Sequence, residues 1–537
     1  MTRMKEISKQ TYLQDFPLGA SDFETIRQKK LLYIDKTDYI HNLIKTSEAC
    51  FIARPRRFGK SLVISTLEAI FKGKKNLFEG LSISTTPRKG QMYLFEEFPV
   101  IRLDLSSIKI SNKEECKNLM HKLLLKQVKL YGFDKEIKSY SSFLEEFYDH
   151  VQKKIVILVD EYDKPVLDNI TQENVLEIQK ELSSFFGATK ICNKYIQFLF
   201  ITGITKLSNA NMFSEGNHII DLGRNEKFDS MFGYTQEELE TQFKPYIEVL
   251  SQKENTSYNE TLINIKKYYN GYTFSESEKS IYNPYSILQL FNENRFDNYW
   301  FNSGTPTFVL ELIKDREFDI SNKTELEYGE DLFDPSQASK LTVKNILFQA
   351  GYLTIKKDQF GEKQLVFPNI EVHDSFYRFF ISFFTDRKIN YSRHLKSIKN
   401  VFLSKDWDSL QEVLNDYFDE FTYETTGSEN LYHSLTFALL KLTGFKVISE
   451  VLTKKGRIDQ YLETKNDIYI IEYKYKSSSV KAMQQIVDRK YFKKYMNTDK
   501  NIYLIGINFE KDGQIKDEIL IINPRDEKSL KGFMDQK

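Results

Sequence analysis

The chain has 537 residues, of which 41% are hydrophobic and 28% charged, a composition of folded globular proteins that excludes a largely disordered chain. Its length predicts roughly two to four domains. Lys+Arg and Asp+Glu both number 76, so whole-chain charge gives no argument for a nucleic-acid partner. The stretch from Lys441 to Lys537, with 20 basic and 14 acidic residues, is positive and weakly favours a phosphate-rich ligand.

Cysteine spacing and hydropathy exclude several classes of protein. Cys50, Cys116 and Cys192 form no C-x-x-C pair, which argues against a disulfide framework and a structural zinc site. The N-terminal residues contain no apolar signal segment, and no apolar stretch is long enough to span a membrane. These features predict a cytoplasmic protein that does not cross a membrane.

The first predicted domain, residues 1–235, alternates short apolar runs with helical patterns. Uninterrupted apolar runs are typical of the buried strands of a parallel sheet. Segments such as Leu62–Phe71 and Asn118–Leu130 have the pattern of covering helices, so the region predicts a three-layer α/β fold. The strands are expected at Cys50–Ala53, Pro99–Leu105, Ile155–Asp160 and Phe198–Gly203.

Two further regions follow. Residues 236–404 are rich in helical patterns and aromatic residues, with a hairpin expected around Tyr352–Phe367. Their sequence predicts no catalytic or binding site. Residues 405–537 predict a mixed sheet with helices, in the order α-β-β-β-α-β. Its helices are expected at Glu429–Thr443 and Ser479–Tyr495, and its strands at Lys446–Leu452, Gly456–Glu463, Ile468–Tyr475 and Asn501–Asn508.

The segment Arg54–Ser61 follows the first predicted strand and precedes a helix. Gly59, Lys60 and Ser61 match the end of the P-loop template G-x-x-x-x-G-K-[ST], whereas Arg54 replaces its first glycine. In a P-loop the lysine reaches the β- and γ-phosphates and the hydroxyl binds Mg²⁺. A basic loop that only caps a helix is the alternative on this segment alone.

A second segment strengthens the prediction of an ATP and Mg²⁺ site. The apolar run ending in Asp160 and Glu161 has the pattern of a Walker B strand, and a metal ion would offset the repulsion of two adjacent acids. Asp160 is expected to hold Mg²⁺ and Glu161 to polarise the attacking water. A strand ending in solvated charge is the alternative, but the two segments together favour the nucleotide site.

Three further residues are candidates at this site. Thr202, at the end of the fourth predicted strand, could sense the γ-phosphate, although threonine is common at strand ends. Arg56 and Arg57 could contact phosphate within the chain or act on the nucleotide of a neighbouring subunit. The second possibility would require a homo-oligomer.

A different combination of residues marks the last region. Asp459 lies 13 residues before Glu472, and Lys474 follows two positions later. Residues two apart on a strand share a face, and a hairpin after Asp459 can bring its carboxylate beside them. Two carboxylates and a lysine on one face predict Mg²⁺-assisted phosphodiester hydrolysis, in which Asp459 and Glu472 bind the metal. Lys474 would position or deprotonate the water, or offset the charge on the phosphorane.

Neighbouring residues could complete this site. Gln485 could support the site or its water, and Glu429 could add an acidic ligand. An exposed strand with alternating charge is the alternative for Glu472 and Lys474 taken by themselves. Several basic residues could contact backbone phosphates or form a solvated helix face, namely Lys476, Lys481, Arg489, Lys490, Lys493 and Lys494.

The chain resembles a family of bacterial proteins that pair an AAA-ATPase-like domain with a PD-(D/E)XK nuclease-superfamily domain. The stretches that carry the resemblance span nearly the whole chain: FPLGASDFETIRQKKLLYIDKTDYI, RPRRFGKS, IVILVDEYDKPV, YNGYTF, YNPYSI, FQAGYLTI, FPNIEV, GRIDQYLET and IIEYKYK. The resemblance implies a P-loop NTPase fold for the first domain and a restriction-endonuclease-like fold for the last. It assigns Lys60, Ser61, Asp160 and Glu161 to the nucleotide site, and Asp459, Glu472 and Lys474 to the nuclease site.

Three functions follow from these expectations. The first is a nucleotide-regulated nuclease, acting on nucleic acid with DNA as the first expectation, in a mobile-element or defence role that the resemblance suggests. The second is an ATP-dependent signalling switch whose last domain binds without cutting. The third is an interaction scaffold with degenerate sites. The sequence does not separate DNA from RNA.

Overall fold

The computed structural model describes residues 13–87, 92–106, 109–207, 218–275, 277, 279–302, 307–316, 318–321, 326–329, 332, 342–385, 390–421, 429–453 and 455–535. The chain divides into two compact units. The first comprises Met1–Phe308 and Tyr328–Val372, and the second comprises Val309–Glu327 and His373–Lys537. Most of the predicted middle region therefore packs within the first unit, and the remainder within the second.

A parallel five-stranded sheet forms the centre of the first unit. Its strands lie in the order β2 (Val100–Asp104), β3 (Ile155–Asp160), β4 (Ile196–Gly203), β1 (Ala49–Ala53) and β5 (Ile220–Asp221). All six residues of β3 are buried, as its uninterrupted apolar run predicts. The four predicted strands are confirmed, whereas the two-residue β5 is too short and too exposed to give a sequence signal.

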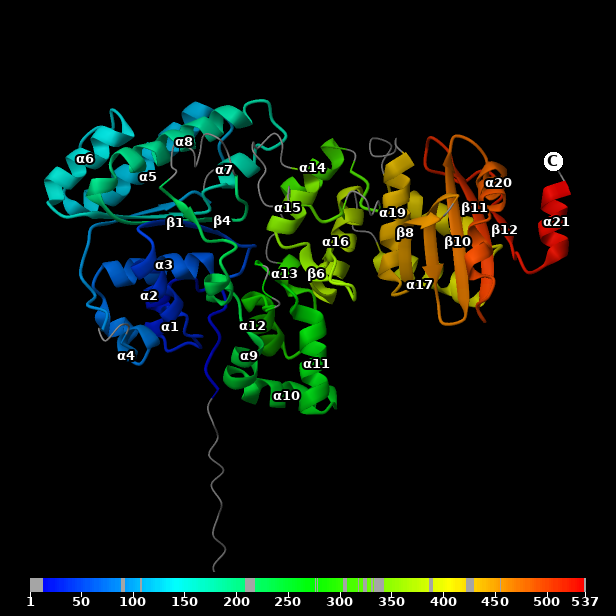
Figure 1. Ribbon diagram of the computed structural model, residues 1–537, viewed down its shortest axis with the longest axis horizontal. Coiled ribbons are helices and arrows are strands. Elements are labelled where there is room, and N and C mark those ends of the chain that lie inside the picture. Colours follow the sequence, from blue (N-terminus) through cyan, green and yellow to red (C-terminus); the bar gives the residue numbers. More distant parts are fainter. Residues whose placement is uncertain are drawn as a thin grey trace, which may run out of the picture. The chain divides into compact units, whose positions relative to one another are not determined.

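Helices cover both faces of this sheet, which confirms the predicted three-layer fold (Figure 1). One face carries α1 (Phe23–Gln28), α2 (Thr37–Thr46), α3 (Lys60–Phe71) and α4 (Ser82–Thr85), and the other α5 (Lys113–Val128), α6 (Tyr140–Val151), α7 (Lys164–Leu167) and α8 (Val175–Ile191). Helix α5 begins five residues earlier than predicted, because the Asn112 side chain caps it by accepting from the backbone N–H of Glu115.

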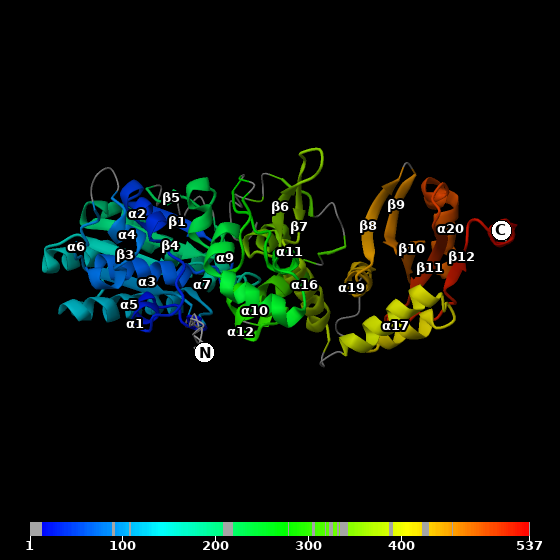
Figure 2. The same cartoon turned by 90° about the horizontal axis from the view of Figure 1, so that it is seen from below.

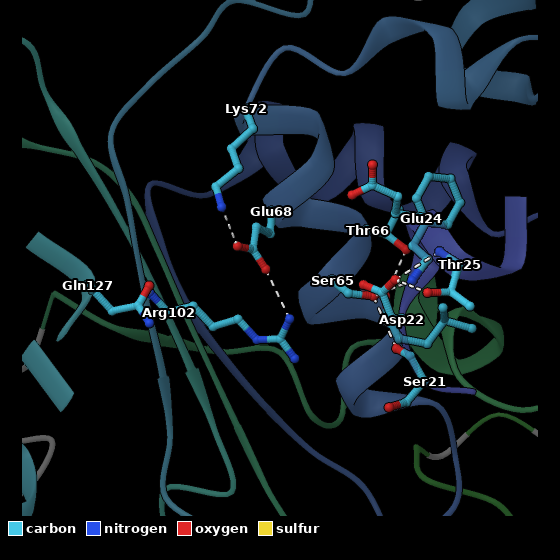
Figure 3. Close-up of polar contacts among 12 residues, drawn as sticks. Ser21, Asp22, Glu24, Thr25, Ser65, Thr66, Glu68, Lys72, Arg102 and Gln127 are labelled. Carbon is cyan, nitrogen blue, oxygen red and sulfur yellow. Dashed lines mark hydrogen bonds and ion pairs between the residues drawn. The ribbon is translucent and has the colours of Figure 1, made fainter. Parts of the chain in front are cut away.

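Polar contacts on two sides hold α3 in place (Figure 3). The hydroxyl of Ser65 accepts from the backbone N–H of Phe23 at 2.9 Å and donates to the carbonyl of Ser21 at 3.1 Å. On the side toward β2, Glu68 accepts from the Arg102 guanidinium at 2.9 Å. The first residues of α3 are Lys60 and Ser61, so these contacts fix the helix that presents both.

The rest of the first unit is mainly helical. The apolar faces of several of its helices pack into one core with residues such as Leu239, Ile265 and Phe291. The hairpin predicted around Tyr352–Phe367 is confirmed as β6 (Thr354–Lys357) and β7 (Lys363–Val366). The helices are α9 (Gln236–Gln242), α10 (Lys244–Glu254), α11 (Tyr258–Tyr269), α12 (Pro284–Glu293), α13 (Tyr299–Asn302) and α15 (Val343–Gln349). Two of the three boundaries between the units fall within α14 (Thr307–Asp315) and α16 (Ile370–Phe383), and the third lies between Glu327 and Tyr328.

A mixed sheet forms the centre of the second unit. Strands β10 and β11 are parallel and the other neighbouring strands are antiparallel, which confirms the predicted mixed sheet. The short β12 was not predicted. The order is β12 (Leu520–Ile522), β11 (Asn501–Phe509), β10 (Asp467–Tyr475), β9 (Gly456–Glu463) and β8 (Lys446–Thr453).

Helices lie on both faces of this sheet (Figure 2), and successive side chains of β10 point to opposite faces. Ile470 packs in a core with Met483 of α20 (Ser479–Arg489), whereas the Tyr469 hydroxyl donates to the Phe402 carbonyl of α17 (Tyr391–Ser404) at 2.7 Å. The predicted helix over Ser479–Tyr495 ends early, because Lys490 adopts a left-handed φ of 54° before a 3₁₀ turn. The remaining helices are α18 (Leu410–Phe418), α19 (Glu429–Leu442) and α21 (Glu527–Asp535). In the part of the chain described, none of the helices combines the length and apolarity needed to cross a membrane.

Gly506 lets α20 lie directly against β11. A Cβ at this position would meet the Ser479 carbonyl oxygen at 2.7 Å and the Met483 backbone nitrogen at 2.8 Å. We expect Gly506→Ala to lower the free energy of unfolding by about 1–3 kcal/mol, because the helix must move away from the sheet.

Differential scanning calorimetry of the full chain measures this effect as a lower transition temperature. Gly532→Ala is the matched control, because a Cβ on Gly532 in α21 would meet nothing within 4 Å. The control should unfold at the same temperature or higher, since alanine favours a helix. Equal transition temperatures for both variants would contradict the close packing of α20.

Candidate functional site

The loop from Arg54 to Gly59 connects β1 to α3 at the edge of the sheet where its parallel strands end. Gly59 has a left-handed φ of 89° as the residue that caps α3, a conformation that glycine adopts without strain. The loop therefore leads into the N-terminus of a 12-residue helix. Free backbone N–H groups at such a terminus favour an anion.

Lys60 is the first residue of α3, and its side chain reaches back to this loop. Its side chain is buried, and its ammonium group donates to the carbonyl oxygens of Arg54 and Pro55, both at 3.0 Å. Burial lowers the pKa of Lys60, and the negative charges of Glu161 and Asp160 oppose that shift. The ammonium group is thus held by the loop's own carbonyls, where phosphate oxygens could replace them.

Asp160, the last residue of β3, lies next to the start of α3. It is 2% exposed. Burial raises the pKa of Asp160, while Ser61 and Lys60 act in the opposite direction. Glu161 follows with a left-handed φ of 48°. The structure thus brings Lys60, Ser61, Asp160 and Glu161 together, and the oxygens of Ser61 and Asp160 fit Mg²⁺, which binds oxygen ligands.

The three arginines of the loop differ in their placement. The Arg54 guanidinium is buried behind the loop, donates to the Ala53 and Gly223 carbonyls at 2.8 Å, and lies 4.3 Å from the Phe274 ring centre. Burial lowers the pKa of Arg54 to about 10. Arg57 is exposed, with its guanidinium 4.7 Å from the Tyr285 ring centre, and Arg56 is half-buried. Arg54 therefore replaces the first glycine of the P-loop template with a buried side chain that packs behind the loop.

Thr202 lies inside the sheet, where its hydroxyl donates to the Ile52 carbonyl of β1 at 2.8 Å. A residue that sequence reasoning missed, Asp163, instead connects the end of β3 to the segment after β4. Its fully buried carboxylate accepts from the backbone N–H and hydroxyl of Thr205, at 2.6 and 2.8 Å, and burial raises its pKa to about 6. The sequence signal is a third acid in the segment Asp160–Asp163, two positions after Glu161.

The second unit brings Asp459, Glu472 and Lys474 together on β9 and β10. The Lys474 ammonium group donates to Oε1 of Glu472 at 3.2 Å and to the Tyr473 carbonyl at 3.1 Å. Oδ2 of Asp459 accepts from the Tyr473 backbone N–H at 2.8 Å. Acidic residues of two neighbouring strands and one lysine therefore lie together, as the sequence predicts.

Glu472 is the most buried member of this group, at 0% exposure. Its Oε2 atom is buried without a hydrogen-bond partner in the described part of the chain. Burial raises the pKa of Glu472, the Asp459 carboxylate raises it further, and Lys474 lowers it. A divalent cation beside Oε2 would offset the repulsion between the buried Glu472 carboxylate and the half-buried Asp459 carboxylate.

The carboxylates of Asp459 and Glu472 suit Mg²⁺ better than a metal ion that takes three or more of its ligands from protein side chains. Among the residues that the structure describes, no group of three or more His, Cys, Asp or Glu side chains is arranged to hold a metal ion. Mg²⁺ is commonly held by one or two carboxylates, with waters and substrate phosphates as its other ligands. Asp459 and Glu472 supply those two carboxylates.

Of the two supporting residues predicted, Gln485 reaches the cluster, with its side-chain amide donating to Oε1 of Glu472. Glu429 is exposed at the first residue of α19. Sequence reasoning missed Tyr491 and Glu450, two residues whose pKa burial raises and the Asp459 charge raises further. The Glu450 carboxylate lies 2.9 Å from the Arg457 guanidinium. Neither position carried a sequence signal, because each reaches the site only through the folded sheet and its covering helix.

The raised pKa of Glu472 predicts that Mg²⁺ binding strengthens as pH rises. A proton on Glu472 competes with the cation, so binding must release it. We expect the increase in melting temperature caused by Mg²⁺ to grow from mildly acidic to mildly alkaline buffer. Without Mg²⁺ the sign reverses: the folded state holds this proton more tightly than the unfolded state, so stability falls as pH rises past the ordinary glutamate pKa.

Thermal unfolding at several pH values, with and without Mg²⁺, measures both trends. Glu472→Gln, which cannot titrate, is the control and should lose the pH dependence of the Mg²⁺ effect. An equal dependence in wild type and this variant would assign the titration to another group.

Comparison with known proteins matches two segments of the chain to described families. Residues 17–213 match the model of a predicted AAA-ATPase, and residues 427–518 match that of the PD-(D/E)XK nuclease superfamily. An uncharacterized protein from the vnfD 5′ region of Azotobacter chroococcum mcd 1 is 27% identical over 516 residues, covering 93% of this chain and 97% of that protein.

Two solved structures share low similarity with the chain. A Walker-type ATPase of Pyrococcus abyssi has a TM-score of 0.30 and 11% identity, covering 67% of this chain and 97% of that one. The ORC2 protein of Aeropyrum pernix has a TM-score of 0.24 and 9% identity, covering 67% and 92%. Both scores are low, so the fold assignment rests on the family matches and the two sheets. This chain joins a predicted AAA-ATPase domain to a PD-(D/E)XK nuclease-superfamily domain.

Proposed function

We propose that this chain is a nucleotide-regulated, Mg²⁺-dependent nuclease that cleaves phosphodiester bonds in DNA. The observation that carries the proposal is the convergence of Asp459, Glu472 and Lys474, where a buried carboxylate oxygen of Glu472 has no hydrogen-bond partner in the described chain. The resemblance to the bacterial family further suggests a role in a mobile element or in defence.

The residues of the second unit have distinct roles in the proposed cleavage. Asp459 and Glu472 hold Mg²⁺, which when bound activates water and stabilises charge on the leaving oxygen. Lys474 lies within hydrogen-bond distance of Glu472 and holds the attacking water or offsets the charge that develops on the phosphate. Gln485 orients the Glu472 carboxylate through its amide.

The first unit would bind ATP at the loop before α3. Lys60 exchanges its bonds to the Arg54 and Pro55 carbonyls for bonds to the β- and γ-phosphates. Ser61 and Asp160 hold Mg²⁺, and Glu161, directly after β3, orients the water for hydrolysis. Arg57, whose side chain is exposed, is available to a phosphate of the same chain or of a second copy.

Cleavage of supercoiled plasmid DNA tests the proposal. The purified full-length chain should nick or linearise the plasmid with Mg²⁺, should not do so with EDTA, and should change its rate when ATP is added. Single-stranded RNA in a parallel reaction separates DNA from RNA as the substrate. No cleavage of either nucleic acid with Mg²⁺ and ATP present would overturn the nuclease assignment.

A signalling switch that binds nucleic acid without cutting is the second candidate. The observation that favours it is the exposed position of Glu429, which leaves two carboxylates, Asp459 and Glu472, in the predicted metal site. Such a protein would bind and hydrolyse ATP while Glu472→Gln left every measured activity unchanged.

A further inference from the structure

The loop that faces the proposed nucleotide is held from behind by residues far along the chain. The Pro55 ring packs against Gly351, where a Cβ would approach it to 2.7 Å. The Phe58 ring packs edge-on against Tyr272 at 4.9 Å. Together with Arg54 on Phe274 and Arg57 on Tyr285, these contacts connect the loop to the helical part of the same unit.

One backbone carbonyl of the loop receives two of these contacts. The Arg56 carbonyl oxygen accepts from the indole Nε1 of Trp300 at 3.2 Å and from the side-chain amide of Asn283 at 3.4 Å. Asn283 is 0% and Trp300 6% exposed, so both donors have little access to water as an alternative partner. Moving the Arg56 carbonyl away would break two buried hydrogen bonds, which is costly.

Both donors are connected to a single carboxylate. Oε1 of Glu371 accepts from the Trp300 backbone N–H at 2.7 Å, and Oε2 accepts from the Ser286 hydroxyl at 2.7 Å. Ser286 lies in the first turn of α12, where its backbone N–H donates to the capping side chain of Asn283 at 3.2 Å. Glu371 is 0% exposed, and burial raises its pKa to about 8.

Glu371 occupies the first turn of α16, the helix within which the first unit ends and the second begins. A shift of the Arg56 carbonyl oxygen would therefore displace Trp300 and Asn283. Their displacement would in turn change the hydrogen bonds of Glu371 at the start of α16. The loop has a reason to shift on binding nucleotide, because Lys60 must release the carbonyls of Arg54 and Pro55, the two residues before Arg56.

From these contacts we infer that Asn283, Trp300 and Glu371 form a relay that reports nucleotide occupancy of the Arg54–Gly59 loop to helix α16. The inference rests on the proposed binding of ATP at this loop and specifies how it regulates the chain. Trp300 and Asn283 act as positioning residues for the loop, and Glu371 couples them to α16. A group of buried, mutually hydrogen-bonded side chains can carry such coupling when it has two discrete arrangements.

Hydrogen–deuterium exchange of the full-length chain tests the relay. Peptides covering residues 370–383 should change their deuterium uptake when ATP and Mg²⁺ are added to wild type. Trp300→Phe keeps an aromatic ring but removes the indole donor, and should lose this change while still binding ATP. Its affinity should fall by no more than about tenfold, the largest effect expected from one neutral hydrogen bond.

Two variants make the comparison decisive. Trp407→Phe is the matched control, because Trp407 lies in the second unit against Tyr469 and Tyr503, and it should respond as wild type does. Glu371→Gln preserves the size of the side chain but replaces one acceptor oxygen by a donor, and should lose the response as Trp300→Phe does. Calorimetric titration with ATP accompanies every exchange measurement.

The outcomes separate the relay from the proposed function. If wild type binds ATP but the 370–383 peptides do not change, the relay is wrong while nucleotide binding stands. If Trp300→Phe and Glu371→Gln respond as wild type does, the relay is also wrong. If wild type shows no saturable ATP binding, both the proposed nucleotide site and the relay are wrong.

Discussion

Glu472→Gln is expected to lower the rate of Mg²⁺-dependent plasmid cleavage by about a thousandfold or more. The substitution keeps the shape of the side chain but removes the charge from the most buried carboxylate of the cluster. A catalytic metal stabilises the transition state by several kcal/mol, and each ~1.4 kcal/mol corresponds to a tenfold change in rate. Initial rates of nicking at several Mg²⁺ concentrations measure the loss.

Glu463→Gln provides the matched control on strand β9. Glu463 is bound to Lys446 and Lys500, both at 2.7 Å, and these lysines hold its pKa at about 2. Removing its charge is expected to affect the stability of the sheet but not cleavage. Equal losses of activity in both variants would show that the effect comes from disturbed folding rather than from a lost metal ligand.

Lys60→Ala is expected to weaken ATP binding by about 10- to 100-fold. A hydrogen bond to a charged group contributes about 1.5–3 kcal/mol, and Lys60 would supply such bonds to the β- and γ-phosphates. The change also removes the positive charge beside Asp160, Glu161 and Asp163, which would then repel the nucleotide. Calorimetric titration of the full chain with Mg²⁺ and ATP measures the affinity.

Lys72→Ala serves as the control for this experiment, because Lys72 follows the same helix and pairs with Glu68 at 2.6 Å. ATP affinity should not change in that variant. Wild-type affinity together with wild-type hydrolysis in Lys60→Ala would exclude Lys60 from the nucleotide site. Retained affinity with lost hydrolysis would assign Lys60 a role in the transition state alone.

Much of the architecture could be predicted because buried parallel strands leave continuous apolar runs in the sequence. Ile155–Asp160 is the clearest case, with six buried residues that end in the proposed Mg²⁺ ligand. Short edge strands carry too few residues for such a pattern, and β5 and β12 were therefore not predicted. The α20 helix was predicted too long because a left-handed residue, Lys490, leaves no strong signal when it is not glycine.

The residues of the candidate sites were predictable where their spacing is local. Glu472 and Lys474 share a strand face, and Lys60 and Ser61 begin a helix, so short-range geometry was sufficient. Supporting residues such as Asn283 and Trp300 lie 227 and 244 positions from the carbonyl that they contact. No short-range pattern encodes such pairs, so they can be recognised only in the folded chain.

The central claim is that Asp459 and Glu472 together hold a divalent cation. Titration of the full-length chain with Mn²⁺ as a paramagnetic substitute for Mg²⁺, with free Mn²⁺ measured by electron paramagnetic resonance, tests it most directly. Wild type is predicted to bind one more ion than Glu472→Gln under the same conditions. Identical Mn²⁺ binding by the two proteins would contradict the metal site and the nuclease mechanism built on it.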